Sequence, residues 1–433
     1  MQLSTLRQPS TPITRAFHIN SEENHASRED RIKEALLLIL CDPVPRECLQ
    51  IWRLSDRDWR RALFWLDISG LALYLLDRLI QLGLCEMLPP WVLERLQQNL
   101  IDNTQRIAGM MEESNAINHH FQKAGLSYAL LKGFSLWPHS VPRLELRSQS
   151  DIDFLIGERD GPEARRILED RGFVLSAIDG REWRFKLNEL RDTSLRNMYK
   201  PTRHLSVELH LETSTALPMI LGRTEDRLIY NTWTPVLAPT DLLIGQGLHL
   251  YKHTCGEHSR AMHLVEFRRH VLARAHDARF WSELREIAAE YPRAPVALGV
   301  VTLLATRAMG SFAPEAFTSW TVDRVPQNVR LWIDIYGTRS VYASSPGTKM
   351  YLLLQEEMEA FGFPRKRSTK SMLLPHKLPH AVMPRMPNET LAGRWLRVSL
   401  QIRLLLRRVR FHIVQDLAFL IESRRWRRRL KRV

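Results

Sequence analysis

The stretch YALLKGFSLWPHSVPRLELRSQSDIDFLI, residues 128–156, decides the fold that this chain can adopt. An apolar run ends at Lys132-Gly133, a polar segment follows, and a second apolar run restarts at Asp151. The short apolar run at 126–132 and the alternating pattern of DIDFLI both predict β-strands. We therefore expect two strands that are joined through a glycine corner and an irregular connection.

The second of these strands carries two carboxylates on the same side. Residues two apart on a β-strand point in the same direction, so Asp151 and Asp153 project together. The strand predicted at 205–212 repeats the pattern and places Glu208 and His210 on its polar face. On neighbouring strands, these polar side chains would share one face of a sheet.

Carboxylates that share a sheet face repel one another unless a positive charge lies between them. Mg²⁺ prefers carboxylate oxygens and completes its shell with water and substrate phosphates. Two such ions can hold the attacking and leaving oxygens of a displacement at phosphorus. We therefore predict that Asp151, Asp153 and Glu208 are the catalytic residues and bind two Mg²⁺ ions. The alternative for the same residues is a solvated polar face.

The corner at Lys132-Gly133 offers groups suited to phosphate. A glycine that ends a strand ahead of a predicted helix lets the backbone approach a triphosphate, whose charge the helix N-terminus favours. Lys132 and Arg147 can neutralise further negative charge. The alternative for Arg147 is an ion pair with Glu145 or Asp153. The alternative for Lys132 is to extend its ammonium into solvent.

Four motifs follow one another along the chain: LLKG at 130–133, RSQSDIDFLI at 147–156, a predicted helix that ends at Gly172-Phe173, and VELH at 207–210. In this order the motifs resemble the uncharacterised nucleotidyltransferase family, within the polymerase-β-like nucleotidyltransferase superfamily. The segments 99–133 and 247–267 resemble the family's long helix before the catalytic strand and its downstream helix with His and Lys. The resemblance covers residues 30–275.

The resemblance implies Mg²⁺ as the cofactor and a nucleoside triphosphate (NTP) as a substrate. It implies that the three carboxylates are metal ligands and that Gly133 lies in the nucleotide-binding turn, with Lys132 and Arg147 at positions of matching residue type. The superfamily's glycine-serine pair is here Gly133-Phe134, and Ser135 is displaced by one residue. We predict that Ser135 also binds the nucleotide, through a phosphate contact that differs from that of the family's serine.

His210 completes the predicted nucleotide-binding set. On the carboxylate face it can contact the nucleotide or orient a metal-bound water, and its alternative is to pack beside the acids. In the downstream helix, where relatives carry an aspartate, this chain has Glu266 or Phe267, and no site residue is assigned there.

The downstream segment also contains four potential zinc ligands: His249, His253, Cys255 and His258. His249 and His253 share a helix face, but the spacing of the four matches no closed zinc site. Lys252 and His253 have the alternative of bordering the nucleotide pocket.

The periodicity along the chain predicts an α+β (mixed α/β) fold, in which a small sheet with helices on one face is flanked by N- and C-terminal helical domains. The predicted units are a loose arm at 1–28, a helical domain at 29–126, a catalytic core at 127–213, a helical domain at 214–342, a Pro-rich connection at 343–390, and a basic amphipathic helix with a tail at 391–433.

Several helix boundaries can be predicted from local residues. A second Asp-x-Asp motif, Asp56-Arg57-Asp58, predicts a helix start rather than a metal site. A long helix should run from Pro90 to Lys123 and stop at Gly125. Thr240 or Asp241 is placed to cap a later helix. Further helices are expected at 259–275, 278–290 and 294–309.

The positive charge is concentrated at the C-terminal end. Residues 384–433 contain 14 Arg or Lys and three acids, a net charge of +11 out of +14 for the whole chain. An apolar stripe at helical spacing runs through the same segment. This segment can complete a helical domain, bind nucleic acid phosphates, or lie on an anionic membrane or an acidic partner. We favour the membrane or acidic-partner role. The final SRRWRRRLKRV is too charged for a core, so Trp426 is expected at an interface or in a solvated tail.

The remaining composition indicates a location in the cell. Four cysteines, irregularly spaced, favour a reducing compartment. The N-terminus has no secretory pattern, and the apolar runs are too short to cross a bilayer. We expect a cytoplasmic protein, either soluble or peripheral to the membrane.

The leading hypothesis is a Mg²⁺-dependent nucleotidyltransferase that transfers a nucleoside monophosphate (NMP) from an NTP to an unidentified acceptor and releases pyrophosphate. One alternative is a catalytically retired core that serves as a nucleotide sensor or scaffold. Another is an RNA-modifying nucleotidyltransferase that uses the basic C-terminal tail as a clamp.

Overall fold

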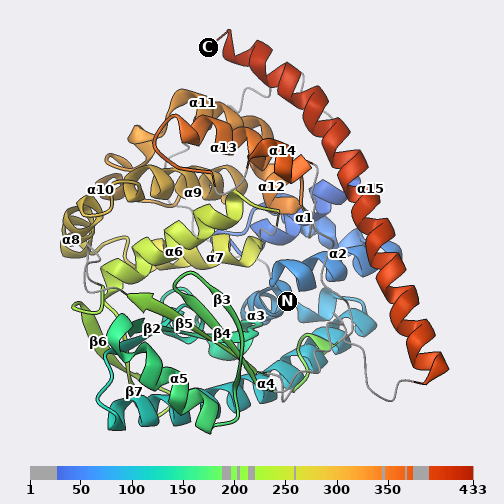
Figure 1. The fold of residues 1–433 in the computed structure, drawn as a ribbon. Coiled ribbons are helices and arrows are strands. Elements are labelled where there is room, and N and C mark those ends of the chain that lie inside the picture. Colours follow the sequence, from blue (N-terminus) through green and yellow to red (C-terminus); the bar gives the residue numbers. More distant parts are fainter. Residues whose placement is uncertain are drawn as a thin grey trace.

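The computed structural model describes residues 27–187, 197–201, 205–212, 220–257, 260–343, 347–365, 368–373 and 390–432. Within these ranges a seven-stranded mixed sheet lies among many helices (Figure 1). The predicted α+β class is confirmed. Residues 1–26 of the predicted arm and 374–389 of the predicted Pro-rich connection lie outside the described residues.

The helices that precede the sheet are α1 (Arg28–Leu38), η1 (Arg46–Arg53), α2 (Asp56–Ser69), α3 (Ala72–Gln81), η2 (Cys85–Met87) and α4 (Pro90–Lys123). The helix start predicted at Asp56-Asp58 is confirmed, because Ser55 and Asp58 form a reciprocal capping box at the start of α2. The predicted bounds of the long helix α4 are also confirmed, and Gly125 follows it at φ 68°.

The strands are β1 (Tyr128–Leu131), β2 (Asp151–Gly157), β3 (Val174–Asp179), β4 (Glu182–Leu187), β5 (Leu205–Glu212), β6 (Thr224–Ile229) and β7 (Thr232–Leu237). Their order in the sheet is β3-β4-β5-β2-β1-β7-β6. β2 pairs in parallel with β5 and antiparallel with β1. The connection from β1 to β2 contains η3 (Gly133–Leu136) and η4 (Leu144–Leu146), and η5 (Glu158–Asp160) and α5 (Gly161–Asp170) follow β2.

Strands β6 and β7 were not predicted, and they carry the sheet past residue 213 to residue 237. Their sequences, TEDRLI and TWTPVL, lack a clear alternation, and Pro235 is unusual within a strand. Tertiary pairing of Val236 with Leu130 brings this hairpin onto the edge of the sheet. The turn residues Tyr230 and Asn231 both have positive φ, 48° and 63°, as two-residue hairpin turns of type I′ require.

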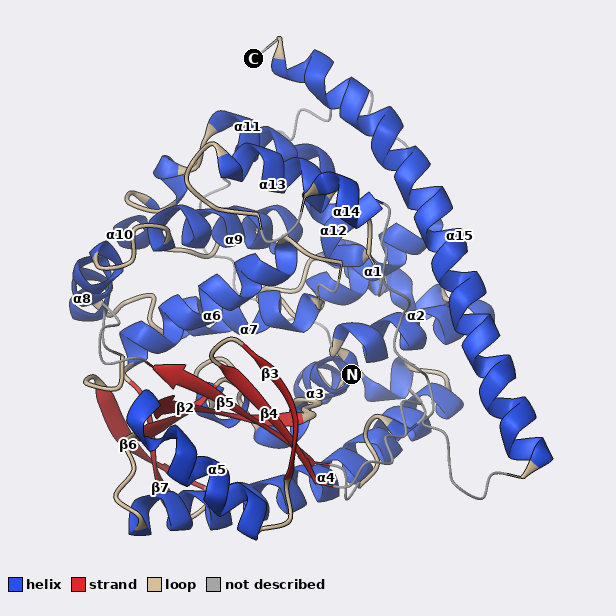
Figure 2. Cartoon of the chain, in the orientation of Figure 1, coloured by secondary structure: helices blue, strands red, loops and turns tan. Residues whose placement is uncertain are grey.

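Helices lie on both sides of the sheet (Figure 2). One face packs against α4 and α5 in a core that includes Phe121, Phe154 and Val207. The opposite face, which carries the predicted site residues, is turned toward α6 and α7, and Leu242 of α6 packs with Leu155 near β1. The sheet is therefore anchored through its apolar side, which leaves the polar side of β2 and β5 available for chemistry.

The helices that follow the sheet are α6 (Pro239–Thr254), α7 (Ala261–Ala273), α8 (Ala278–Ala289), α9 (Ala294–Met309), α10 (Glu315–Thr318), η7 (Val322–Arg324), α11 (Gln327–Trp332), the π-helix η8 (Ile333–Gly337), α12 (Thr338–Tyr342), α13 (Tyr351–Glu359), α14 (Thr369–Leu373) and α15 (Leu391–Leu430). The cap predicted at Thr240 or Asp241 is wrong, because the N-cap is Ala238 and makes no side-chain hydrogen bond. Asp241 instead accepts two hydrogen bonds from Arg223, at 2.8 and 2.9 Å.

Helix α15 runs along one side of the molecule, where Figure 1 draws it in red, and docks through its C-terminal half. Asp416 pairs with the buried Lys349, and Glu422 accepts a hydrogen bond from Tyr336 at 2.9 Å. The expectation for Trp426 is wrong: the side chain is buried, and its Nε1 donates to Glu357 at 2.9 Å. The flanking Arg425 and Arg427 are exposed, so their charges stay in solvent while the indole enters the core.

The apolar stripe of α15 stays largely on the surface, in contrast to Trp426. Its exposed residues are Leu391, Trp395, Leu396, Val398, Ile402, Leu406, Val409, Ile413, Val414, Leu417, Leu420 and Ile421. The stripe is therefore not the part of α15 that completes the helical core. Among the described residues, no helix has both the length and the hydropathy of a membrane span.

Replacing Trp426 with alanine is expected to weaken the docking of α15. Loss of a buried indole and of its hydrogen bond to Glu357 costs about 3 kcal/mol or more. Hydrogen–deuterium exchange of the amides in 412–430 should therefore become faster. Trp395→Ala, at a side chain that is 71% exposed on the same helix, is the matched control and should leave this exchange unchanged. Equal protection in both variants would contradict the docking role of Trp426.

Candidate active site

The register between β2 and β5 brings the predicted carboxylates together. Asp153 lies directly opposite Glu208, and Asp151 lies opposite Ser206. The strands are parallel and in phase, so Ile152, Phe154, Val207 and Leu209 enter one core while the acids point to the other face. Asp153 and Glu208 therefore lie side by side on adjacent strands.

Asp153 is the centre of the polar cluster. Its Oδ1 lies 2.8 Å from Nζ of Lys132 and 2.9 Å from Nε2 of His210. Nε2 of His210 is also 3.8 Å from Oε2 of Glu208. Ligand atoms of Asp153, Glu208 and His210 all lie within 4.8 Å of one another, so these residues can share one metal ion. Asp151 shares the strand but is not part of this group.

The acids differ in their electrostatic environments. Burial alone would raise the pKa of Asp153, but the contacts of His210 and Lys132 outweigh it and lower the pKa to about 2. Burial and then the charge of Asp153 raise the pKa of Asp151. Burial and the charges of Asp153 and Asp151 likewise raise the pKa of Glu208. Burial and the neighbouring acids thus outweigh the nearby positive charges at Asp151 and Glu208, and a bound cation would offset this effect.

The corner between β1 and the connection is a backbone conformation that favours glycine. Lys132 and Gly133 both have positive φ, 47° and 37°. A Cβ on Gly133 would lie 2.5 Å from Oε1 of Gln149. The segment after the corner is the four-residue 3₁₀-helix η3. Ser135, which is buried there, donates its hydroxyl to the Lys132 carbonyl at 2.8 Å.

Arg147 lies behind this corner and pairs with neither Glu145 nor Asp153. Its Nε donates to Oε1 of Glu266 at 3.0 Å, and its Nη1 donates to Oε1 of Gln149 at 3.2 Å. Gln149 is the side chain that packs on Gly133. Arg147 is therefore placed to support the corner, and its predicted contact with the nucleotide stays a prediction.

Some residues near the acids were missed by the sequence analysis. Nε of Arg184 on β4 lies 3.1 Å from Oε1 of Glu208, and the two residues are register partners. Burial lowers the pKa of Arg106, and the charge of Asp151 acts in the opposite direction. The two charges therefore interact. Alternation in EWRFKL could have placed Arg184 on the polar face, but Arg106 reaches the site from α4, where no local pattern marks it.

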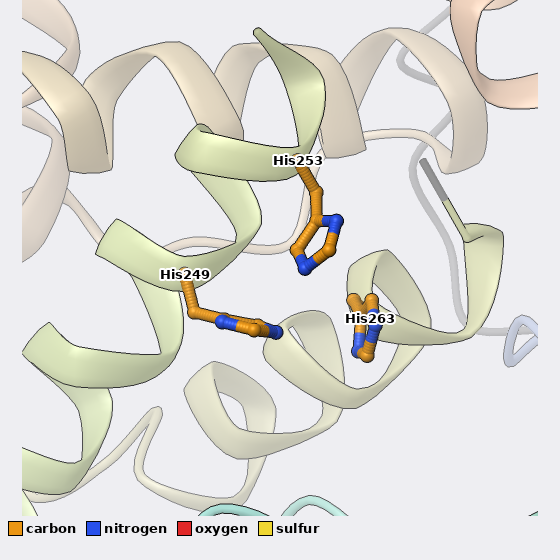
Figure 3. Close-up of side chains that lie close together, drawn as sticks. All are labelled: His249, His253 and His263. Atoms are coloured by element: carbon orange, nitrogen blue, oxygen red, sulfur yellow. The ribbon is translucent and has the colours of Figure 1, made fainter. Parts of the chain in front are cut away.

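Two of the four potential zinc ligands of the downstream segment lie together in the structure. His249 and His253 on α6 lie beside His263 on α7, which the sequence analysis did not single out (Figure 3). Cys255 is not part of this group, and His258 lies outside the described residues. The third ring comes from a different helix, so the spacing along α6 alone could not reveal the cluster.

Fold and site together define an α+β protein with a carboxylate cluster suited to a hard cation beside a glycine corner. The family model described as an uncharacterised nucleotidyltransferase matches residues 55–310, more than half of the 433-residue chain. The chain belongs to this family and is a transferase of nucleotidyl groups. The family resemblance inferred from the motifs is confirmed.

A solved structure that matches is the crystal structure of an antigenic nucleotidyltransferase-like protein from Paracoccidioides brasiliensis, with 13% identity, coverage of 47% of this chain and 94% of that chain, and a TM-score of 0.27. A superposition at this TM-score supports no transfer of site residues. The search of curated proteins gave no significant match.

The pair between Arg147 and Glu266 generates a pH-dependent prediction. Burial would raise the pKa of Glu266, but the charge of Arg147 and the nearby His263 lower it to about 2. A carboxyl with a depressed folded-state pKa stabilises the fold above its unfolded pKa of about 4.3, and this stabilisation is lost as the pH falls toward 2. Glu266→Gln should therefore cost a few kcal/mol at pH 7.

Urea unfolding between pH 7 and pH 3 checks this prediction. The difference in unfolding free energy between the wild type and Glu266→Gln should shrink as the pH falls below about 4. Glu283→Gln, at an exposed position on α8, is the control and should show a difference near zero throughout. A Glu266→Gln difference that is independent of pH would contradict the ion pair.

Proposed function

We propose that this protein is a Mg²⁺-dependent nucleotidyltransferase that transfers an NMP from an NTP to an acceptor hydroxyl or phosphate and releases pyrophosphate. The observation that carries the proposal is the side-by-side position of Asp153 and Glu208 on parallel strands, with Lys132 bound to Asp153. The family establishes transfer of a nucleotidyl group, and the ion, the donor and the acceptor chemistry belong to the proposal.

The donor set fits magnesium. Asp153 and Glu208 offer hard carboxylate oxygens, and burial together with the neighbouring acids raises the pKa of Glu208 and of Asp151, an effect that a bound cation would offset. We assign Asp153, Glu208 and Asp151 as the residues that hold the metal. Bound Mg²⁺ supplies charge stabilisation for the phosphoryl oxygens and the leaving pyrophosphate.

The basic residues would act on the nucleotide. Lys132 has a raised pKa, because Asp153 outweighs the lowering effect of burial, so it stays protonated at neutral pH. When a cation takes its place beside Asp153, the flexible ammonium can turn to a triphosphate oxygen. Gly133 would let the triphosphate approach the backbone, and His210 would hold Asp153 in orientation from the next strand.

Asp153→Asn is expected to abolish most of the transfer activity. Loss of one charged ligand removes about 4 kcal/mol of transition-state stabilisation, which corresponds to a rate decrease on the order of 10³-fold. The measurement is release of pyrophosphate from each of the four NTPs, with Mg²⁺ and with EDTA, in the presence of a cell extract that supplies the acceptor. Asp179→Asn, at an exposed end of β3, is the matched control and should keep full activity.

The outcomes separate the competing functions. Full activity in Asp153→Asn would remove the assignment of the site. A chain that binds an NTP in calorimetry but releases no pyrophosphate with any extract fraction would favour a retired sensor or scaffold. Label transferred to RNA, with binding that falls steeply with salt, would favour an RNA-modifying enzyme.

We further propose that α15 holds the protein on an anionic membrane surface. The exposed apolar residues Trp395, Ile402 and Val409 recur every seven residues, and exposed Arg403 and Arg410 lie beside them. A helix of this composition can bury its apolar side chains at the boundary of headgroups and acyl chains while arginines meet anionic lipids. A solvated helix would not need so continuous an apolar stripe.

Co-sedimentation with vesicles tests the membrane proposal. The chain should bind phosphatidylcholine vesicles that contain phosphatidylserine, and bind pure phosphatidylcholine much more weakly. Arg403→Gln combined with Arg407→Gln and Arg410→Gln should reduce binding about 100-fold at low salt, since each charge contributes about 1 kcal/mol. Trp395→Ala should also weaken binding, whereas Trp233→Ala, at an exposed indole on β7, should not.

Other results of this experiment would remove the proposal. Equal binding to neutral and anionic vesicles would exclude the arginines as the source of affinity. Self-association in sedimentation, lost in Trp395→Ala, together with no vesicle binding, would show that the stripe pairs with a second copy of the chain.

A further inference from the structure

Three imidazoles converge beside the carboxylate cluster. His249 and His253 come from α6 and His263 comes from α7 (Figure 3). Their ring centroids are 4.4 Å apart for His249 and His253, 5.2 Å for His249 and His263, and 5.3 Å for His253 and His263. One ring nitrogen from each lies within 4.8 Å of the other two, so a single ion can contact all three.

The helices explain how the rings meet. His249 and His253 are four residues apart, which places them on the same face of α6 about one turn from each other. The start of α7 returns alongside α6 and presents His263 to that face. All three rings are partly buried, so they are held in place yet reachable.

A metal ion between the three rings would bind through the lone pairs of neutral imidazoles. Neutral imidazoles have a free lone pair, whereas charged rings at this spacing would repel one another.

Glu266 distinguishes this cluster from histidines that simply pack together. Its fully buried Oε2 faces Nδ1 of His263 at 3.6 Å and has no hydrogen-bond partner within the described residues. A carboxylate on the far nitrogen of a histidine is the usual support of a metal ligand, because it fixes the ring and its tautomer. Oε1 of Glu266 is held by Arg147 and by Tyr74, at 3.0 and 2.9 Å, which anchors the carboxylate.

We propose that His249, His253 and His263 bind a divalent transition metal of the zinc class, with Glu266 as the outer carboxylate that orients His263. Three nitrogen ligands are a donor set for zinc and leave a fourth position open to water or substrate oxygen. The carboxylate cluster has harder oxygen donors and suits magnesium, so the two sites differ in metal preference.

The histidine site adjoins the proposed catalytic site. The Lys132 ammonium and the Asp153 carboxylate are close enough to influence the pKa of His249. Glu266 also connects the two, because it pairs with Arg147 behind the glycine corner. Binding of a metal to the histidines does not depend on the proposed function, because the readout below is the metal itself.

The experiment measures metal binding by the full chain. Protein stripped with EDTA and dialysed is titrated with Zn²⁺ in calorimetry, and Co²⁺ is used as a spectroscopic substitute. We expect one tight Zn²⁺ per chain and visible Co²⁺ absorption of a four-coordinate site. His249→Gln, His253→Gln and His263→Gln should each weaken Zn²⁺ binding by about 100-fold or more, and Glu266→Gln by about 10- to 100-fold.

Two control variants locate the ion. His119→Gln, at an exposed histidine on α4, should keep wild-type Zn²⁺ affinity. Asp153→Asn should still bind one Zn²⁺ per chain, since that residue belongs to the carboxylate cluster. Circular dichroism of each stripped variant verifies that it is folded before titration.

Specific results would overturn the histidine site. They are absence of Zn²⁺ uptake by the stripped wild-type chain at micromolar metal, a Co²⁺ spectrum without four-coordinate absorption, and unchanged affinity in the histidine variants. Loss of Zn²⁺ in Asp153→Asn rather than in the histidine variants would place the ion at the carboxylates instead.

Discussion

The parallel pairing of β2 with β5 is the constraint on which the rest of the site depends. It sets Asp153 against Glu208 and requires that positive charge be brought to them. In this structure Lys132 and His210 share Oδ1 of Asp153 and keep it ionised. Two carboxylates this close would otherwise raise one another's pKa, at a cost that only compensating charge removes.

That requirement explains the strained corner at the end of β1. Lys132 adopts a positive φ, which is uncommon for a residue with a Cβ, and its ammonium reaches Asp153 on the adjacent strand. Gly133 continues the turn where a larger residue would strike Gln149. Unfavourable backbone conformations of this kind persist where the surrounding structure holds them, and they cluster at functional sites.

A second buried ion pair links the sheet to the helices that follow it. Arg147, from the connection before β2, pairs with Glu266 of α7, and Tyr74 of α3 donates to the same carboxylate. Segments far apart in the sequence therefore meet on one buried acid. The pair orients Gln149 on one side and faces His263 on the other, so the corner and the histidine cluster share a single support.

The local sequence determined most of the elements. The strands around Asp153 and Glu208, the helix from Pro90 to Lys123 and the cap of α2 all follow from period, glycine and capping residues. The alternation of polar and apolar residues also predicted that Asp153 and Glu208 point to the polar face of the sheet. Alternation along a strand decides the direction of each side chain before any partner is present.

Tertiary structure alone decided which strands became neighbours and which side chains met across helices. The hairpin β6–β7 joined the sheet through Val236, Trp426 was buried among arginines, and Arg147 found Glu266 rather than Glu145. These outcomes rest on contacts between residues far apart in the chain. Periodicity reports the direction of a side chain relative to its own backbone, whereas its partner is selected by packing and by the pairing of buried charge.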